Sequence, residues 1–277
     1  MVRLLLGLAE LGCMHRNAFN VFCNRLRLRP IFASLHLDDV TALLSGLSQV
    51  RFLDQALFDA LVLRFQHQYD DVSDVHASIA AEAFSSMHLF NDDLYSVVAD
   101  RAVDLAADMK PTAAVMILRS FGRVGIEHPE VAVTLGGRVA ACAPQLPVGA
   151  LIGTLEALSQ MGHVDADTFN KVGGVIADKV HELTDSDLAL LCGITQQLNW
   201  RDDRLLTALA GQALKLKATN ALPASTSRAV LDTMNYFLVH DDTTRQSLSS
   251  MARTVSRETL PECEPEDPRM RRLAMKP

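Results

Sequence analysis

The amino-acid sequence repeats about every 37 residues, and this period constrains the fold more than any other feature. One apolar residue in each repeat marks this period and is here called the anchor. The anchors follow one another at intervals of 39, 37, 37, 37, 37 and 39 residues; they are Leu11, Val50, Met87, Val124, Met161, Leu198 and Phe237. A fixed period of this size is typical of solenoids, whose units bury their apolar faces only by stacking on neighbours. Since solenoids mostly bind other macromolecules, the period also indicates a class of function.

Each unit has the pattern of a helix–turn–helix hairpin around its anchor. Four residues after the anchors stand capping or turn types, namely His15, Asp54, Asn91, His128, Asp165, Asp202 and Asp241. Three residues before the anchors stand mostly large apolar types, namely Leu8, Leu47, Phe84, Phe121, Leu158, Thr195 and Met234. After Asp165, the residues Phe169, Val172 and Ile176 recur at helical spacing. The sequence therefore predicts an all-α fold, a right-handed α-solenoid of about seven repeats of 37–39 residues, the first incomplete at its N-terminus.

The composition agrees with one continuous helical array. Hydrophobic residues make up 49% of the chain but aromatic residues only 5%, which is a helical rather than a strand-forming composition. Because nothing interrupts the period before Pro261, residues 1–260 are expected to form a single array. Residues 261–277 are rich in proline and charge, and we expect them to be extended or disordered.

Small residues recur twelve and thirteen positions after the anchors, for example Gly136, Gly137, Ala210 and Gly211. Glycine inside a helix costs about 1 kcal/mol relative to alanine. Its recurrence in frame therefore predicts that two helices cross closely at these positions.

Charge and cysteine content limit the compartment and the partners. The net charge of −7 makes the chain an unpromising general binder of nucleic acid, because phosphate contacts need Lys and Arg. Residues 1–29 are nevertheless basic, with five Arg against one Glu. The five cysteines form no CxxC pair and their number is odd, which indicates buried thiols in a reducing compartment. No apolar run is long enough to span a bilayer, so we expect a soluble protein without membrane contact.

The sequence carries no recognisable catalytic motif. It lacks HExxH, GxSxG, a CxxC pair and a Walker-type loop. Its nine histidines are expected to have structural roles. We therefore expect no enzymatic activity, no cofactor and no metal site.

One candidate binding set consists of arginines. Four arginines stand fourteen residues after the first four anchors and so form a ladder: Arg25, Arg64, Arg101 and Arg138. Arg16, Arg27 and Arg29 add to the basic character of the first hairpin and its exit. These side chains are candidates for contacting phosphates or an acidic partner. The alternative is that they form ion pairs between repeats or bind carbonyl groups at helix ends.

A second polar ladder stands one residue before the anchors. It consists of Glu10, Gln49, Ser86, Arg123, Gln160, Gln197 and Tyr236. Helical-repeat RNA readers use one base per repeat, so Arg123, Gln160 and Gln197 are candidates for base contacts. The alternative is that these residues are simply the outer face of amphipathic helices.

One repeat shows the unit pattern most clearly: Leu43, Leu44, Leu47 and Val50 are followed by Asp54, Phe58 and Arg64. This pattern resembles the 37–38-residue helical hairpins of organellar RNA-metabolism proteins. Those families are the heptatricopeptide and octotricopeptide repeat proteins and the helical region of FAST-kinase-domain-like proteins. The resemblance covers residues 1 to about 257 and implies mitochondrial or plastid RNA metabolism. The chain lacks a RAP-type domain after the repeats and is acidic, which favours a scaffold subunit over a nuclease.

From this resemblance we expect a non-catalytic binding scaffold in a mitochondrial RNA-processing or RNA-editing complex. Its expected partners are other protein subunits and, through the candidate residues, RNA. One alternative is a protein–protein adaptor of armadillo or HEAT type without RNA contact. Another is a subunit of the mitochondrial ribosome or an assembly factor.

Overall fold

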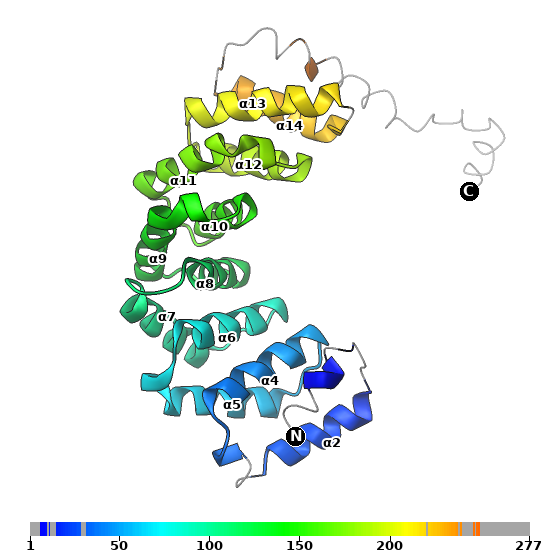
Figure 1. The fold of residues 1–277 in the computed structure, drawn as a ribbon, viewed down its shortest axis with the longest axis vertical. Coiled ribbons are helices and arrows are strands. Elements are labelled where there is room, and N and C mark those ends of the chain that lie inside the picture. Colours follow the sequence, from blue (N-terminus) through cyan, green and yellow to red (C-terminus); the bar gives the residue numbers. More distant parts are fainter. Residues whose placement is uncertain are drawn as a thin grey trace, which may run out of the picture. The chain divides into compact units, whose positions relative to one another are not determined.

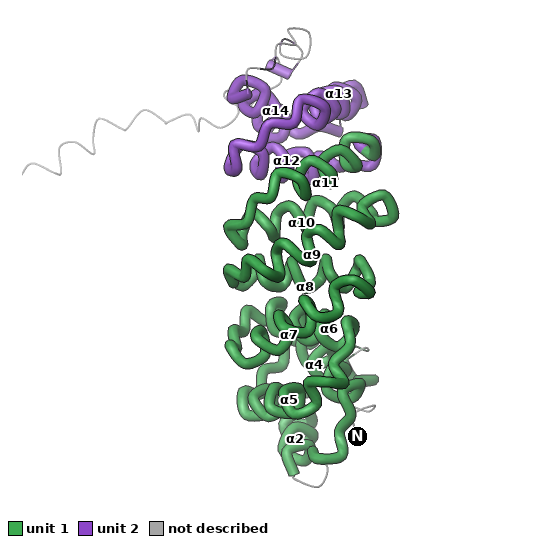
Figure 2. Tube along the Cα trace, turned by 90° about the vertical axis from the view of Figure 1, so that its left-hand side faces the viewer, with its two compact units in different colours: residues 1–179 green, residues 180–277 purple. Residues whose placement is uncertain are grey.

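The computed structural model describes residues 6–9, 11, 15–28, 32–219, 221–237, 239, 246, 248 and 249. Most of the described chain is helical, and it contains no β-strand, which confirms the all-α prediction (Figure 1). Arg29, Glu10, Asp241 and the tail 261–277 lie outside the described residues. Contacts divide the chain into two compact units, Met1–Lys179 and Val180–Pro277, coloured separately in Figure 2. The expectation of one array over residues 1–260 stays a prediction.

Unit 1 consists of helices that alternate between two layers. The first layer contains α4 (Leu37–Gln49), α6 (Asp74–Ser86), α8 (Pro111–Val124) and α10 (Val148–Gln160). The second contains α5 (Gln55–His67), α7 (Asp92–Leu105), α9 (Pro129–Cys142) and α11 (Ala166–Asp178). Within each layer successive helices pack against one another, as the ladder of helices in Figure 1 shows. The unit also contains α2 (Arg16–Leu26) and the short 3-10 helices η1 (Tyr69–Asp71) and η2 (Ala143–Gln145).

Unit 2 contains the same kind of hairpin. Its helices are η3 (Val180–Glu182), α12 (Asp185–Gln197), α13 (Asp203–Ala218) and α14 (Ala224–Tyr236). Helices α12 and α14 pack side by side, and α13 contacts both. Gln196 on α12 donates a hydrogen bond to the Thr233 hydroxyl on α14, which fixes the pair across one repeat length.

The predicted anchors mark the ends of the first helices of the hairpins. Val50, Met87, Met161, Leu198 and Phe237 are C-caps, and Val124 is the last residue of α8. The next residue has a positive φ in five successive hairpins: Arg51, His88, Gly125, Gly162 and Asn199. The left-handed backbone conformation of this residue reverses the chain direction. The amide of the following residue can then donate a hydrogen bond to the carbonyl oxygen three residues before the anchor, for example Ile126 to Phe121 at 3.0 Å.

The predicted capping residues begin the second helices. His15, Asp54, Asn91, His128, Asp165 and Asp202 are the N-caps, and each side chain accepts a hydrogen bond from the backbone amide three residues later. Each cap satisfies an amide that the helix itself leaves unpaired. The turn chemistry and the period thus set the helix boundaries locally.

The core lies between the layers, where the in-frame apolar positions meet. The residues three before the last six anchors are buried: Leu47, Phe84, Phe121, Leu158, Thr195 and Met234. The residues eight after the anchors are also buried: Phe19, Phe58, Tyr95, Ala132, Phe169 and Leu206. Aromatic rings bridge the layers, as in the edge-to-face contact of Tyr95 with Phe121 at 5.3 Å.

At three of the small residues that predicted a close helix crossing, Gly136, Gly137 and Gly211, the structure shows none. A Cβ on Gly137 or Gly211 would meet open space, and one on Gly136 would make only ordinary contacts. The tight approach is instead in the first layer, where a Cβ on Gly122 would lie 2.8 Å from Ala157 Cα. Gly137 and Gly211 lie on exposed helix surface, so their recurrence does not reflect packing.

The cysteines of the described region agree with the expectation of buried thiols. Cys23 and Cys192 are buried and Cys142 is half-buried, and all three are free. Burial raises the pKa of both the Cys23 and the Cys192 thiols to about 11.

Candidate nucleic-acid interface

The polar ladder one residue before the anchors lies at the C-terminal ends of the first-layer helices. In unit 1, Gln49 and Gln160 are exposed, and Ser86 and Arg123 are half-buried. In unit 2, Gln197 occupies the equivalent exposed position on α12. Because the first-layer helices of unit 1 pack side by side, these residues share one face of that unit, here called the ladder face. Both readings of the ladder, as base contacts and as a helix surface, fit this position.

Two members of the predicted polar ladder, Arg123 and Gln160, line a polar hollow of about 240 Å³ between α8 and α10. Its lining consists of Arg119, Arg123, Gly153, Glu156, Ala157 and Gln160. Arg123 and Gln160 come together here although they are 37 residues apart, which is one repeat. The hollow therefore joins neighbouring members of the predicted ladder.

Arg123 is held in place from the neighbouring helix α6. Its Nη1 donates hydrogen bonds to Glu82 Oε1 and Ser85 Oγ, each at 3.1 Å. The pair is partly exposed, with side-chain accessibilities of 30% for Arg123 and 37% for Glu82. This contact positions the guanidinium at the edge of the hollow while neutralising part of its charge.

The structure adds Arg119, which the sequence analysis did not select. Arg119 is exposed, and its side chain extends over Gly153 of α10. A Cβ at position 153 would lie 3.1 Å from Arg119 Cδ and 3.2 Å from its Nε. The signal that could have revealed Arg119 is helical periodicity, because it lies four residues before Arg123 and so on the same helix face.

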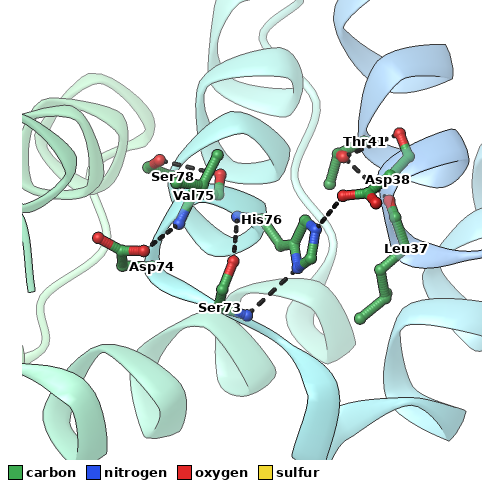
Figure 3. Close-up of polar contacts among 8 residues, drawn as sticks. All are labelled: Leu37, Asp38, Thr41, Ser73, Asp74, Val75, His76 and Ser78. Carbon is green, nitrogen blue, oxygen red and sulfur yellow. Dashed lines mark hydrogen bonds and ion pairs between the residues drawn. The ribbon is translucent and has the colours of Figure 1, made fainter.

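A second hollow on the ladder face, of about 380 Å³, lies between α4 and α6 and includes Gln49. Within this hollow, His76 Nε2 lies 2.8 Å from Asp38 Oδ1 (Figure 3). The backbone amide of Ser73 donates to His76 Nδ1, so Nε2 must carry the proton that is shared with Asp38. Figure 3 shows His76 between the N-termini of the two helices, where it links adjacent hairpins.

The arginine ladder contacts the backbone of the preceding hairpin. Arg64 donates to the carbonyl oxygens of Leu35 and Ala33, Arg101 to those of Val72 and Asp70, and Arg138 to that of Met109. In each case the main acceptor is 29 residues earlier in the chain. Where the ladder ends, other side chains make this contact: Lys179 bonds to Leu146 O, and Gln212 to Leu183 O. These bonds match the structural interpretation of the ladder, and they leave its binding role a proposal.

The remaining candidates belong to the N-terminal hairpin. Arg16 and Arg25 are exposed on α2. Arg27 lies 3.4 Å from Asp54, which ties its charge to the next hairpin, and it also bonds to Asn24. The structure does not describe Arg29. Arg16 and Arg25 are therefore the candidates of this hairpin for which the structure gives an exposed position.

The stacked hairpins of unit 1, with polar hollows on the ladder face, place the protein in the class of helical-repeat proteins. A family model described as RESC6, RNA-editing substrate-binding complex 6 protein, matches residues 1–242, and the chain belongs to this family. A comparison with curated proteins finds no match. The family confirms the expected relation to RNA editing, whereas the particular repeat type stays a prediction. Within the described residues, each helix is too short or too polar to traverse a bilayer.

Proposed function

We propose that this protein is a non-catalytic scaffold of a mitochondrial RNA-editing complex, in which it binds other protein subunits and contacts RNA directly. The observation that carries the proposal is the family match over residues 1–242, since the family is named for an RNA-editing substrate-binding complex. The fold supports it, because stacked hairpins create long surfaces on which several partners can bind. The finer architecture belongs to the same proposal: about seven hairpins in one right-handed α-solenoid.

The ladder face of unit 1 is the surface that best fits RNA. It combines amide, hydroxyl and guanidinium groups at intervals of one repeat, with the imidazole of His76 beside them, a set that can pair with base edges and phosphates. Gln197 extends the same sequence position into unit 2. The exposed Arg16 and Arg25 of α2 are candidates for a further contact with a polyanion.

The acidic charge of the chain favours protein partners on other surfaces. Residues 30–110 contain thirteen acidic and four basic residues. Several of the carboxylates, including Asp70, Asp71, Asp74 and Asp108, line a hollow of about 390 Å³ near the segments that join successive hairpins. Phosphate repulsion would direct RNA away from this region, which leaves it for protein subunits.

The experiment is purification of the tagged full-length protein from its own cells after ultraviolet crosslinking, with and without nuclease. The proposal expects crosslinked RNA, together with RNA-editing proteins that remain after nuclease treatment. Cell fractionation of the same strain tests the mitochondrial location. Nuclease-resistant protein partners without crosslinked RNA would favour the adaptor alternative. Co-purification of proteins unrelated to RNA editing would overturn the proposal.

A further inference from the structure

Arg119 differs from Arg123, its neighbour on α8, and from the three ladder arginines that bond to the preceding hairpin. Arg123 is paired with Glu82, and Arg64, Arg101 and Arg138 donate to backbone carbonyls. Arg119 is exposed, and the structure gives its guanidinium no hydrogen bond or ion pair within the described residues. An arginine that is not used for stability retains its five N–H donors for an external ligand.

The surroundings of Arg119 restrict where its side chain lies. The glycine at position 153 leaves a flat patch on α10, and the arginine stem lies on it. A Cβ at this position would approach Arg119 Cδ to 3.1 Å, so any larger residue would require the arginine stem to shift. The stem is thereby held between two adjacent repeats, which reduces the entropy that Arg119 must lose on binding.

We propose that the hollow between α8 and α10 is a phosphodiester-binding site for single-stranded RNA, with Arg119 as the phosphate-binding residue. This inference rests on the proposed function and deepens it by naming the contact. The fork of a guanidinium matches two oxygens of one phosphate, and such charge-assisted pairs are among the stronger hydrogen bonds. Gln160, on the neighbouring helix, can donate to and accept from a base that follows this phosphate.

The composition of the hollow favours RNA over an acidic peptide. Glu156 shares the hollow with Arg119 and Gln160. The Glu156 carboxylate repels phosphates as well as the Asp and Glu side chains of a peptide, so either anion must lie on the Arg119 side of the hollow. Glu156 can also accept a hydrogen bond from an amino group on a base edge while the phosphate lies on Arg119. An RNA strand therefore offers an anion to Arg119 and a hydrogen-bond donor to Glu156, whereas the acidic side chains of a peptide offer only the anion.

The test measures binding of the full-length protein to a fluorescent 20-nucleotide single-stranded RNA of mixed sequence over a series of KCl concentrations. Arg119→Gln is expected to weaken binding about tenfold, the loss of one charge-assisted contact. Its plot of log affinity against log salt should be shallower by about 0.7, the change for one phosphate on a single strand. Arg119→Lys keeps the charge but lacks the forked donors of the guanidinium, so its RNA affinity should lie between that of the parent protein and that of Arg119→Gln.

The matched control is Arg51→Gln, which removes one positive charge from an exposed hairpin turn of the same unit. It should change both affinity and salt slope much less than Arg119→Gln does. Gly153→Ala provides a second variant that leaves every charge in place, and it should weaken binding by displacing the Arg119 stem. Thermal unfolding of each variant verifies that the fold is kept.

Several outcomes would overturn the site. Equal effects of Arg119→Gln and Arg51→Gln would mean that only net charge matters. Tighter binding of a poly-glutamate peptide than of RNA, with the same dependence on Arg119, would assign the hollow to an acidic protein. Absence of RNA binding by the parent protein would remove the site, while the scaffold proposal would still be decided by the proteins that co-purify.

Discussion

Arg101 binds the carbonyl oxygen of Val72 with two donors, at 3.1 Å from Nε and 2.9 Å from Nη2. Val72 lies where one hairpin ends and the next begins, and its side chain is fully buried. The same relationship joins Arg64 to Leu35, 29 residues apart in both pairs. A guanidinium therefore supplies the hydrogen bonds that this connecting backbone lacks. Adjacent hairpins of unit 1 are tied together by their backbone as well as by their apolar core.

Arg101→Met keeps the apolar stem of the side chain but removes the donors to Val72. We expect the free energy of unfolding to fall by about 1–3 kcal/mol, the cost of leaving a buried acceptor unpaired. Urea unfolding followed by circular dichroism measures the change. The comparison is Arg119→Gln, whose side chain is exposed and should alter stability by less than about 0.5 kcal/mol. Equal stability of Arg101→Met and the parent would show that water replaces the guanidinium.

The combined variant Arg25→Gln, Arg64→Gln and Arg101→Gln separates binding from stability in the arginine ladder. Because Arg64 and Arg101 are engaged with backbone carbonyls, we expect a lower melting temperature. The RNA affinity of the folded protein and its salt dependence should change only through Arg25, by about one phosphate contact or less. A slope reduced by three contacts, with unchanged melting, would assign the ladder to the binding surface instead.

Leu158→Asp places a charge in the seam between adjacent hairpins. Leu158 is 1% exposed and its methyl groups face Gly136 of α9. Loss of the leucine alone costs about 2–5 kcal/mol, and the buried carboxylate adds to this. Chemical denaturation should show a large shift of the midpoint, whereas Gln160→Asp at an exposed position of the same helix should show a small one. An unchanged midpoint for Leu158→Asp would mean that the assigned helix face is wrong.

Two helical glycines should respond to alanine in opposite directions. Gly122→Ala introduces a methyl group 2.8 Å from Ala157 Cα and should destabilise the protein by about 1–3 kcal/mol through overpacking. Gly137→Ala meets open space and should stabilise it by about 0.5–1 kcal/mol through helix propensity. The difference between the two unfolding midpoints is the measurement. A stabilising Gly122→Ala would show that α8 and α10 can separate without cost.

We expect Asp165, the N-cap of α11, to make the stability of the protein depend on pH. The Thr168 side chain and backbone donate hydrogen bonds to its carboxylate and hold its pKa below the ordinary value of 3.8. A lowered pKa in the folded state contributes stability above pH 3.8, and that contribution is lost as the pH falls towards the folded pKa. Asp165→Asn keeps an N-cap but cannot titrate, so its melting temperature should fall less than that of the parent on acidification. Parallel curves for the two proteins between pH 5 and pH 3 would contradict this role of Asp165.

The local structure of each hairpin follows from the residues of that hairpin. The apolar residues recur at the helical period of 3.6, so the buried faces, including Phe84 and Leu158, could be read directly. Caps such as Asp54 and Asn91 act on amides only three residues away, so the helix starts followed from neighbouring residues alone. The link to RNA editing was also within reach, because it depended on a pattern of residue types that a family shares.

The contacts of the polar ladders depend on how the hairpins stack in three dimensions. Arg123 and Arg101 occupy equally regular positions, yet one borders an open hollow and the other bonds to a carbonyl 29 residues earlier. A long, flexible side chain can reach several partners, and the partner depends on how one hairpin is superimposed on the next. The same superposition placed Arg119 over Gly153, a contact that neither residue's own segment encodes. Periodicity therefore fixed which residues are equivalent, while the stacking of the repeats decided which of them border an open hollow and which bond to the backbone of the preceding hairpin.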